Sequence, residues 1–174
     1  MPRPNLLIAA SAAALLACAV GCTGEEPADA SHDGPLRLGG EMGTLCIPAG
    51  SSTEFTLGLD AVQNSTKADI KVDRVRLIGA DNATMVDGYL APILDNTLIG
   101  AIPGWPPRQG ATAAFDQKKT VPTTISAGKD ANLVVHVKAT APAQIKAVEV
   151  TYTSDGKPLR VQNTTSLTIR NTCS

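Results

Sequence analysis

The side chains in this 174-residue chain that could do chemistry include four cysteines and two histidines. His32 and His136 are far apart in sequence, and neither has a second histidine at the HxH or HxxxH spacing that brings two metal ligands together. No serine lies in the GxSxG pattern of a hydrolase nucleophile, and the carboxylates are scattered. His136 alternates with valines and is expected on the polar, exposed face of a strand. The sequence therefore predicts no catalytic residue, no metal site and no cofactor.

The first 21 residues have the features of a secretion signal. Arg3 is followed by Leu6–Val20, an apolar run interrupted by one serine. A membrane-spanning helix needs roughly 20 apolar residues, so this run is short for one and suits a signal peptide. It ends in Ala19-Val20-Gly21-Cys22, which resembles the bacterial lipobox. The resemblance implies that residues 1–21 are removed and that Cys22 receives lipid, which would anchor an extracytoplasmic protein to the cell membrane.

Two alternatives stay open at this end of the chain. Leu15-Leu16-Ala17-Cys18 also fits the lipobox loosely, and an ordinary secretion signal could be cleaved near Gly21. We prefer Cys22, because lipid on Cys18 would shorten the apolar run and leave Cys22 as an unpaired thiol in an oxidising compartment.

Residues 22–35 are expected to form the lipidated cysteine and a flexible acidic tether. Thr23–Pro35 holds four acids, no bases and no bulky apolar residue, so it cannot nucleate a core. The whole chain has 15 basic and 16 acidic residues; without Arg3 and these four acids, 14 basic and 12 acidic residues remain in residues 36–174. This small excess predicts no binding to nucleic acid.

Cys46 and Cys173 remain near the two ends of the domain, and outside the cytoplasm a disulfide is the default for such a pair. A zinc site would need a second pair of ligands, and a redox couple would need CxxC proximity. We therefore predict a structural disulfide between Cys46 and Cys173.

Hydrophobic residues alternate with polar ones along residues 36–174, as in half-buried antiparallel strands. The clearest stretches are Phe55–Ala61, Ile70–Leu77, Leu133–Val137, Val148–Tyr152 and Leu167–Cys173. A change of parity near Asp73–Arg74 predicts a bulge, and Asp155-Gly156 predicts a hairpin with a type I′ turn. Seven to nine strands at this spacing favour an all-β, antiparallel β-sandwich of immunoglobulin-like type over a barrel.

One segment, Leu94–Lys119, departs from the strand pattern and contains the only tryptophan, in Trp105-Pro106-Pro107. Because prolines donate no ladder hydrogen bonds, the segment is expected to be a loop or a strand-edge crossing. It could protrude as a stiff loop that contacts a partner through these three residues, or Trp105 could fold back and plug one end of the sandwich.

The lipobox, the acidic tether, and segments such as Val72–Ile93 and Val148–Arg160 resemble small actinobacterial-type lipoproteins of uncharacterised function. That group brings no activity to carry over. The expected function is a non-enzymatic interaction or accessory module of the cell envelope, bound to the membrane by its lipid and to an envelope protein; no particular oligomeric state is implied. The alternative is a small-ligand or metal-binding lipoprotein of an uptake or metal-handling system.

Overall fold

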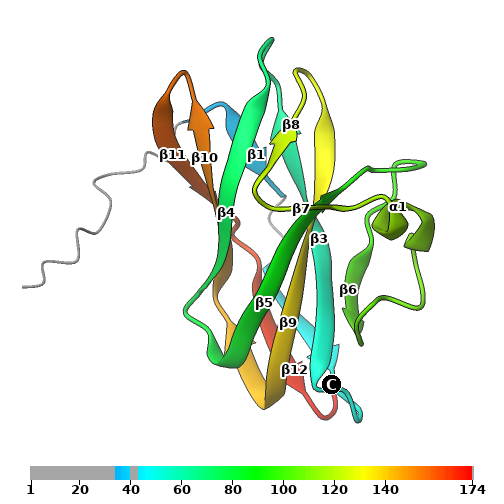
Figure 1. Ribbon diagram of the computed structural model, residues 1–174. Coiled ribbons are helices and arrows are strands. Elements are labelled where there is room, and N and C mark those ends of the chain that lie inside the picture. Colours follow the sequence, from blue (N-terminus) through cyan, green and yellow to red (C-terminus); the bar gives the residue numbers. More distant parts are fainter. Residues whose placement is uncertain (1–33, 40–42, 174) are drawn as a thin grey trace, which may run out of the picture.

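Alternating apolar and polar residues build two β-sheets that pack face to face as a sandwich (Figure 1). The computed structural model describes residues 34–39 and 43–173. The predicted signal peptide, the predicted lipid site at Cys22 and the tether up to residue 33 lie outside the described residues.

The larger sheet has eight strands, which follow the order β1-β3-β9-β12-β2, while β5 pairs with β9, β6 with β3, and β7 with β5. All of these pairs are antiparallel except β2 with β12. The strands are β1 (Leu36–Leu38), β2 (Thr44–Pro48), β3 (Glu54–Asn64), β5 (Asp81–Ala91), β6 (Gly100–Pro103), β7 (Lys119–Thr120), β9 (Asp130–Ile145) and β12 (Ser166–Arg170).

The smaller sheet has four strands in the order β11-β10-β4-β8. They are β4 (Ile70–Ile78), β8 (Thr123–Ile125), β10 (Ala147–Ser154) and β11 (Lys157–Gln162). The main core lies between the two sheets, and its largest fully buried side chains are Tyr152 and Phe55. The one helix of the described residues, α1 (Thr112–Asp116), has about one and a half turns. No helix in this part of the chain is long and apolar enough to cross a membrane.

The predicted antiparallel β-sandwich is confirmed; the narrower immunoglobulin-like class stays a prediction. The described residues form twelve strands where seven to nine were expected. Three of these, β1, β7 and β8, have only two or three residues, too few to show a period in the sequence.

Two local predictions are confirmed by the pairing of β10 with its neighbours. Thr151 lies opposite Arg74 and Tyr152 opposite Val72, so Asp73 is the extra residue of a bulge. Its carboxylate accepts a hydrogen bond from the Thr153 hydroxyl at 2.6 Å. In the turn that joins β10 to β11, Asp155 and Gly156 both have positive φ angles, as a type I′ turn requires.

The expected alternation along β3 is wrong after Leu57. A register shift against β9 lies between Leu57 and Asp60, and one extra residue reverses which side chains point inward. As a result Leu59 and Ala61 are only partly buried, whereas Asp60 and Asn64 are buried. The bulge was missed because Leu59 and Ala61 continue the apolar pattern through it.

The predicted disulfide between Cys46 and Cys173 is confirmed, with a Cα–Cα distance of 5.8 Å. Cys46 lies in β2, the strand beside β12. The strand predicted over Leu167–Cys173 is shorter than expected, however: β12 ends at Arg170, and Cys173 lies beyond it and is exposed. The bond therefore ties the chain end back to an edge strand at the surface.

Candidate partner-binding surface

The segment between β6 and β7 crosses the outer face of the larger sheet. β6 pairs with β3, β3 with β9, β9 with β5, and β5 with β7, so β6 and β7 lie at opposite sides of this set of strands. The chain between them, which includes α1, covers the face that points away from the smaller sheet (Figure 1). We call residues 104–110 of this segment the Trp105 loop.

Three of the chain's five aromatic residues gather under and beside this loop. The Trp105 ring stacks on the His136 imidazole of β9, with centroids 4.1 Å apart and an interplanar angle of 6°. Phe115 of α1 meets Trp105 edge-on at 5.0 Å, and Tyr89 of β5 lies at 5.4 Å. These contacts build a second, smaller hydrophobic cluster outside the main core.

A cation lies at the rim of this cluster. The Lys118 ammonium is 3.9 Å from the centre of the Phe115 ring and 5.6 Å from that of Tyr89. The Tyr89 hydroxyl donates a hydrogen bond to the Asp87 carboxylate at 3.2 Å. The negative faces of the aromatic rings attract the ammonium group, so the cluster combines a positive charge with apolar side chains.

Hydrogen bonds from β3 hold the start of the Trp105 loop. The Gly104 N–H donates to the Glu54 carbonyl oxygen at 2.6 Å, and the buried Thr56 hydroxyl donates to the Gly104 carbonyl oxygen at 2.8 Å. Thr56 points outward from the sheet, and the loop covers it. A polar residue on the outer face is thus buried because it binds the backbone above it.

The prediction that His136 is exposed is wrong: only 7% of its surface is accessible. The alternation of β9 does place it on the outer face, but Trp105 covers that face. Burial lowers the pKa of the imidazole below its ordinary 6.5; the Glu54 and Asp87 carboxylates oppose this, and the Lys138 ammonium adds to it. The covering loop could not be foreseen from the period of β9 alone.

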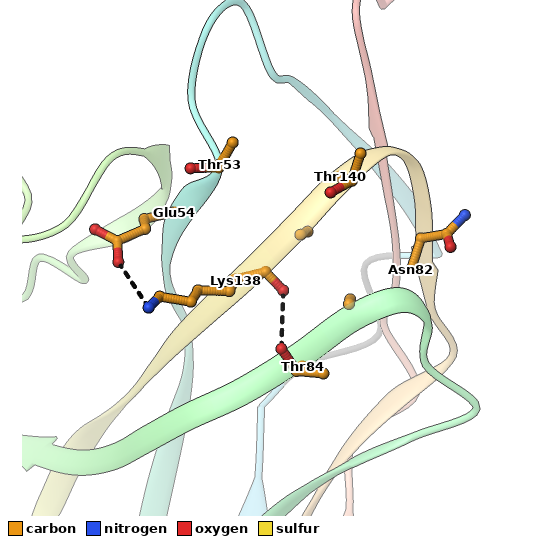
Figure 2. A pocket seen from close by; sticks show the side chains of 8 residues that line it. Thr53, Glu54, Asn82, Thr84, Lys138 and Thr140 are labelled. Atoms are coloured by element: carbon orange, nitrogen blue, oxygen red, sulfur yellow. Dashed lines mark hydrogen bonds and ion pairs between the residues drawn. The ribbon is translucent and has the colours of Figure 1, made fainter.

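An open hollow of about 660 Å³ lies where the starts of β3 and β5 meet the middle of β9 at Lys138–Thr140. The Lys138 side chain reaches across from β9 to Glu54, with 3.6 Å between the ammonium nitrogen and Oε1 (Figure 2). The hydroxyl groups of Thr53, Thr84 and Thr140 line the remainder (Figure 2). Its lining combines the charged and hydroxyl groups with the methyl groups of the threonines and of Ala83 and Ala139.

A second hollow, of about 570 Å³, lies on the other side of Glu54 and is lined by Trp105 itself. Ser52, Ile102–Pro106, Arg108 and Gln109 form its wall. Because Ser52, Thr53 and Glu54 are consecutive, the two hollows are neighbours across the start of β3. Together with the aromatic cluster they form one uneven surface of apolar, hydroxyl and charged groups, which we call the outer-face surface.

The three residues predicted to contact a partner have different exposures. Trp105 is partly buried, Pro106 is exposed, and Pro107 is buried. Trp105 therefore does not protrude, and it folds back over the outer face of the larger sheet instead of plugging an end of the sandwich. Tyr89, Phe115 and Glu54 were not predicted as part of this surface. The scarcity of aromatic residues was the one available signal, because large apolar side chains tend to gather where burial is possible.

The described residues contain no group of three His, Cys, Asp or Glu side chains that could hold a metal ion. His136 Nε2 lies 3.7 Å from Glu54 Oε1, and the Lys138 ammonium contacts the same carboxylate oxygen at 3.6 Å.

No protein-family model matches the chain, and a search of curated proteins finds no match.

Proposed function

We propose that this protein is a lipid-anchored, extracytoplasmic β-sandwich of immunoglobulin-like type that binds an envelope protein through its outer-face surface and catalyses no reaction. The membrane anchor is expected at Cys22, ahead of the tether. The partner is expected to contact Trp105, Pro106 and the two hollows beside them.

The observation that carries this proposal is the position of the outer-face surface relative to the start of the domain. Gly34 packs so closely on the Tyr152 hydroxyl that a Cβ atom there would overlap it, which fixes the entering chain against β10 of the smaller sheet. The Trp105 loop lies on the far face of the larger sheet, on the opposite side of the molecule (Figure 1). A tether that enters beside β10 leaves the outer-face surface free to meet a partner.

Sheet edges are weaker candidates for the contact. β5 is an edge strand beyond its short pairing with β7, but a register shift between Met85 and Asp87 makes Val86 a bulge. Bulges and charged side chains protect edge strands from pairing with another chain. We therefore favour side-chain contacts at the outer-face surface over the addition of a partner strand.

Site-specific photo-crosslinking in intact cells tests the proposal. A photoreactive residue replaces Arg108, an exposed residue of the Trp105 loop; the matched control replaces Arg74, an exposed arginine of β4 in the smaller sheet. We expect a discrete crosslinked envelope protein from position 108 and none from position 74. Equal products from both positions, or none from position 108, would contradict the proposal.

The anchor has its own test, because it does not depend on the partner. Labelled palmitate should be incorporated into the wild-type chain and lost in Cys22→Ala. Incorporation that survives this substitution would remove Cys22 from the proposal, and Cys18→Ala would then be the next variant to examine.

A further inference from the structure

His136 is a buried titratable group without a hydrogen bond at Nε2. This atom is shielded from solvent and has no hydrogen-bond partner; Glu54 Oε1, at 3.7 Å, is too far away for a hydrogen bond. The imidazole is closed off by the stacked Trp105 ring. A proton added to His136 would therefore place a positive charge in a site from which water is excluded, while opening of the loop would hydrate that charge.

Charged groups on the surrounding elements both raise and lower the pKa of the His136 imidazole. β3 contributes Glu54 and β5 contributes Asp87, which both favour the imidazolium form, whereas Lys138 on β9 disfavours it. The covering loop brings Arg108, which lines the hollow beside Trp105, and Lys118 follows α1 at the rim of the cluster. Burial is the largest effect, so the closed loop favours the neutral imidazole.

The Trp105 loop is built so that it can move without the sheet. Gly104 and Gly110 bound it, with φ angles of 102° and 82° that side-chain-bearing residues rarely adopt. Between them, residues 105–109 make no backbone–backbone hydrogen bond to any described residue. Gly104 is hydrogen-bonded to β3, and beyond it the ring contacts of Trp105 hold the loop, of which the stack on His136 has the shortest centroid distance.

We propose that the Trp105 loop is a pH-sensitive cover, which lies closed over neutral His136 and opens when His136 is protonated. The direction follows from linkage. The pKa of His136 is lower in the closed form than in the open form, where it is near the ordinary 6.5. Neutral His136 therefore stabilises the closed form fully above pH 6.5, and this stabilisation is lost as the pH falls below that value. Mild acid would therefore change the shape of the outer-face surface.

Because Trp105 is the only tryptophan, its fluorescence reports on the loop directly. We expect its emission in the full chain to move to longer wavelength, with stronger quenching by acrylamide, between about pH 8 and about pH 5. Far-UV circular dichroism should stay constant over this range, which separates loop opening from unfolding. An emission maximum that does not change with pH would overturn the proposal.

Three variants test the assignment to His136. His136→Gln keeps a planar polar side chain without a titrating ring and should abolish the shift. Lys138→Met removes a charge that opposes protonation and should weaken the shift, whereas Glu54→Gln should strengthen it. If His136→Gln does not fold, the last two still decide, since equal effects or effects in the opposite directions would contradict the proposal.

Control of partner binding by this movement would rest on the proposed function. The opening of the loop itself does not depend on that function. The fluorescence assay contains no partner, so a negative result would leave the crosslinking test untouched. A failed crosslinking test would likewise leave the pH response in place.

Discussion

Asn132 is a single residue on which three parts of the larger sheet depend. It is fully buried; its amide donates to the carbonyl oxygens of Gly58 at 3.1 Å and Asp60 at 2.9 Å, and its carbonyl oxygen accepts from the Ile99 N–H at 2.8 Å. The first two bonds satisfy the backbone at the β3 bulge, and the third fixes the chain just before β6. The Asn132 side chain thus links the bulge in β3 to β6, the strand that leads into the Trp105 loop.

We expect Asn132→Ala to lower the free energy of unfolding by about 2–3 kcal/mol, because buried carbonyl and N–H groups lose their partners. Urea denaturation of the full chain measures this loss. The matched control is Asn171→Ala, which changes an exposed asparagine near the chain end and should have little effect. Equal destabilisation by both substitutions would contradict the role given to Asn132.

Asp60 contributes a pH dependence of its own. It is buried; Oδ2 accepts from Asn163 at 2.8 Å, while Oδ1 has no hydrogen-bond partner. Burial raises the pKa of the carboxyl group above its ordinary 3.8, against the effect of the Asn163 bond. A raised folded-state pKa gives stability that is full below 3.8 and is lost as the pH rises through the folded-state value.

We therefore predict that Asp60→Asn becomes more stable relative to the wild type as the pH rises from about 3 to about 6. Urea midpoints of both proteins at the two pH values measure this. Asp116→Asn, at an exposed carboxyl of α1, should show no such trend. A difference between Asp60→Asn and the wild type that is independent of pH would rule out the buried, raised-pKa carboxyl.

Among the secondary-structure elements, the sequence predicts the alternation of buried and exposed side chains along a strand well, but it predicts the bulges that interrupt this alternation poorly. The bulge at Asp73 was visible because apolar residues change parity there. The bulge in β3 was not, because Leu59 and Ala61 continue the pattern on the wrong face. His136 was assigned to the correct face of β9, yet its burial depends on a loop more than twenty residues earlier in the chain. Burial by a loop from another part of the chain cannot be seen in the alternation of residues along one strand.

The attachment of the Trp105 loop to β3 can be tested at this scale. Thr56→Val keeps the shape of the side chain and removes its hydrogen bond to the Gly104 carbonyl oxygen, which should cost about 1 kcal/mol and loosen the loop. We expect Trp105 emission at neutral pH to shift to longer wavelength. Thr124→Val, at an exposed position of β8, is the control and should leave the emission unchanged. The same emission in both variants would show that Thr56 does not hold the loop.

For the whole molecule, the disulfide pairing was predicted from the sequence because only Cys46 and Cys173 remain after the predicted signal peptide and lipid site are set aside. It joins residues 127 apart and ties the chain end to β2. In the chain-entropy account, removing such a cross-link costs about 4–5 kcal/mol, and often less in practice. We expect the double variant Cys46→Ser/Cys173→Ser to unfold at clearly lower urea concentration. An unchanged midpoint would mean that the bond contributes nothing to stability.

The outer-face surface could be predicted only in part. The unusual Trp-Pro-Pro sequence pointed to the segment, but its partners come from β3, β5, β9 and α1, and only the tertiary fold brings them together. The surface also lies opposite the position where the chain enters at Gly34. This arrangement is the basis for the proposed role as a membrane-tethered binding module.

Hydroxyl-radical footprinting of the purified full chain and of the chain in intact cells tests that role most directly. We expect oxidation around Trp105, Pro106 and Arg108 to be reduced in cells, and oxidation around Lys71 and Arg74 on the smaller sheet to be unchanged. Equal oxidation of the Trp105 loop in both settings, or protection confined to the smaller sheet, would contradict the proposal that the outer-face surface binds a partner.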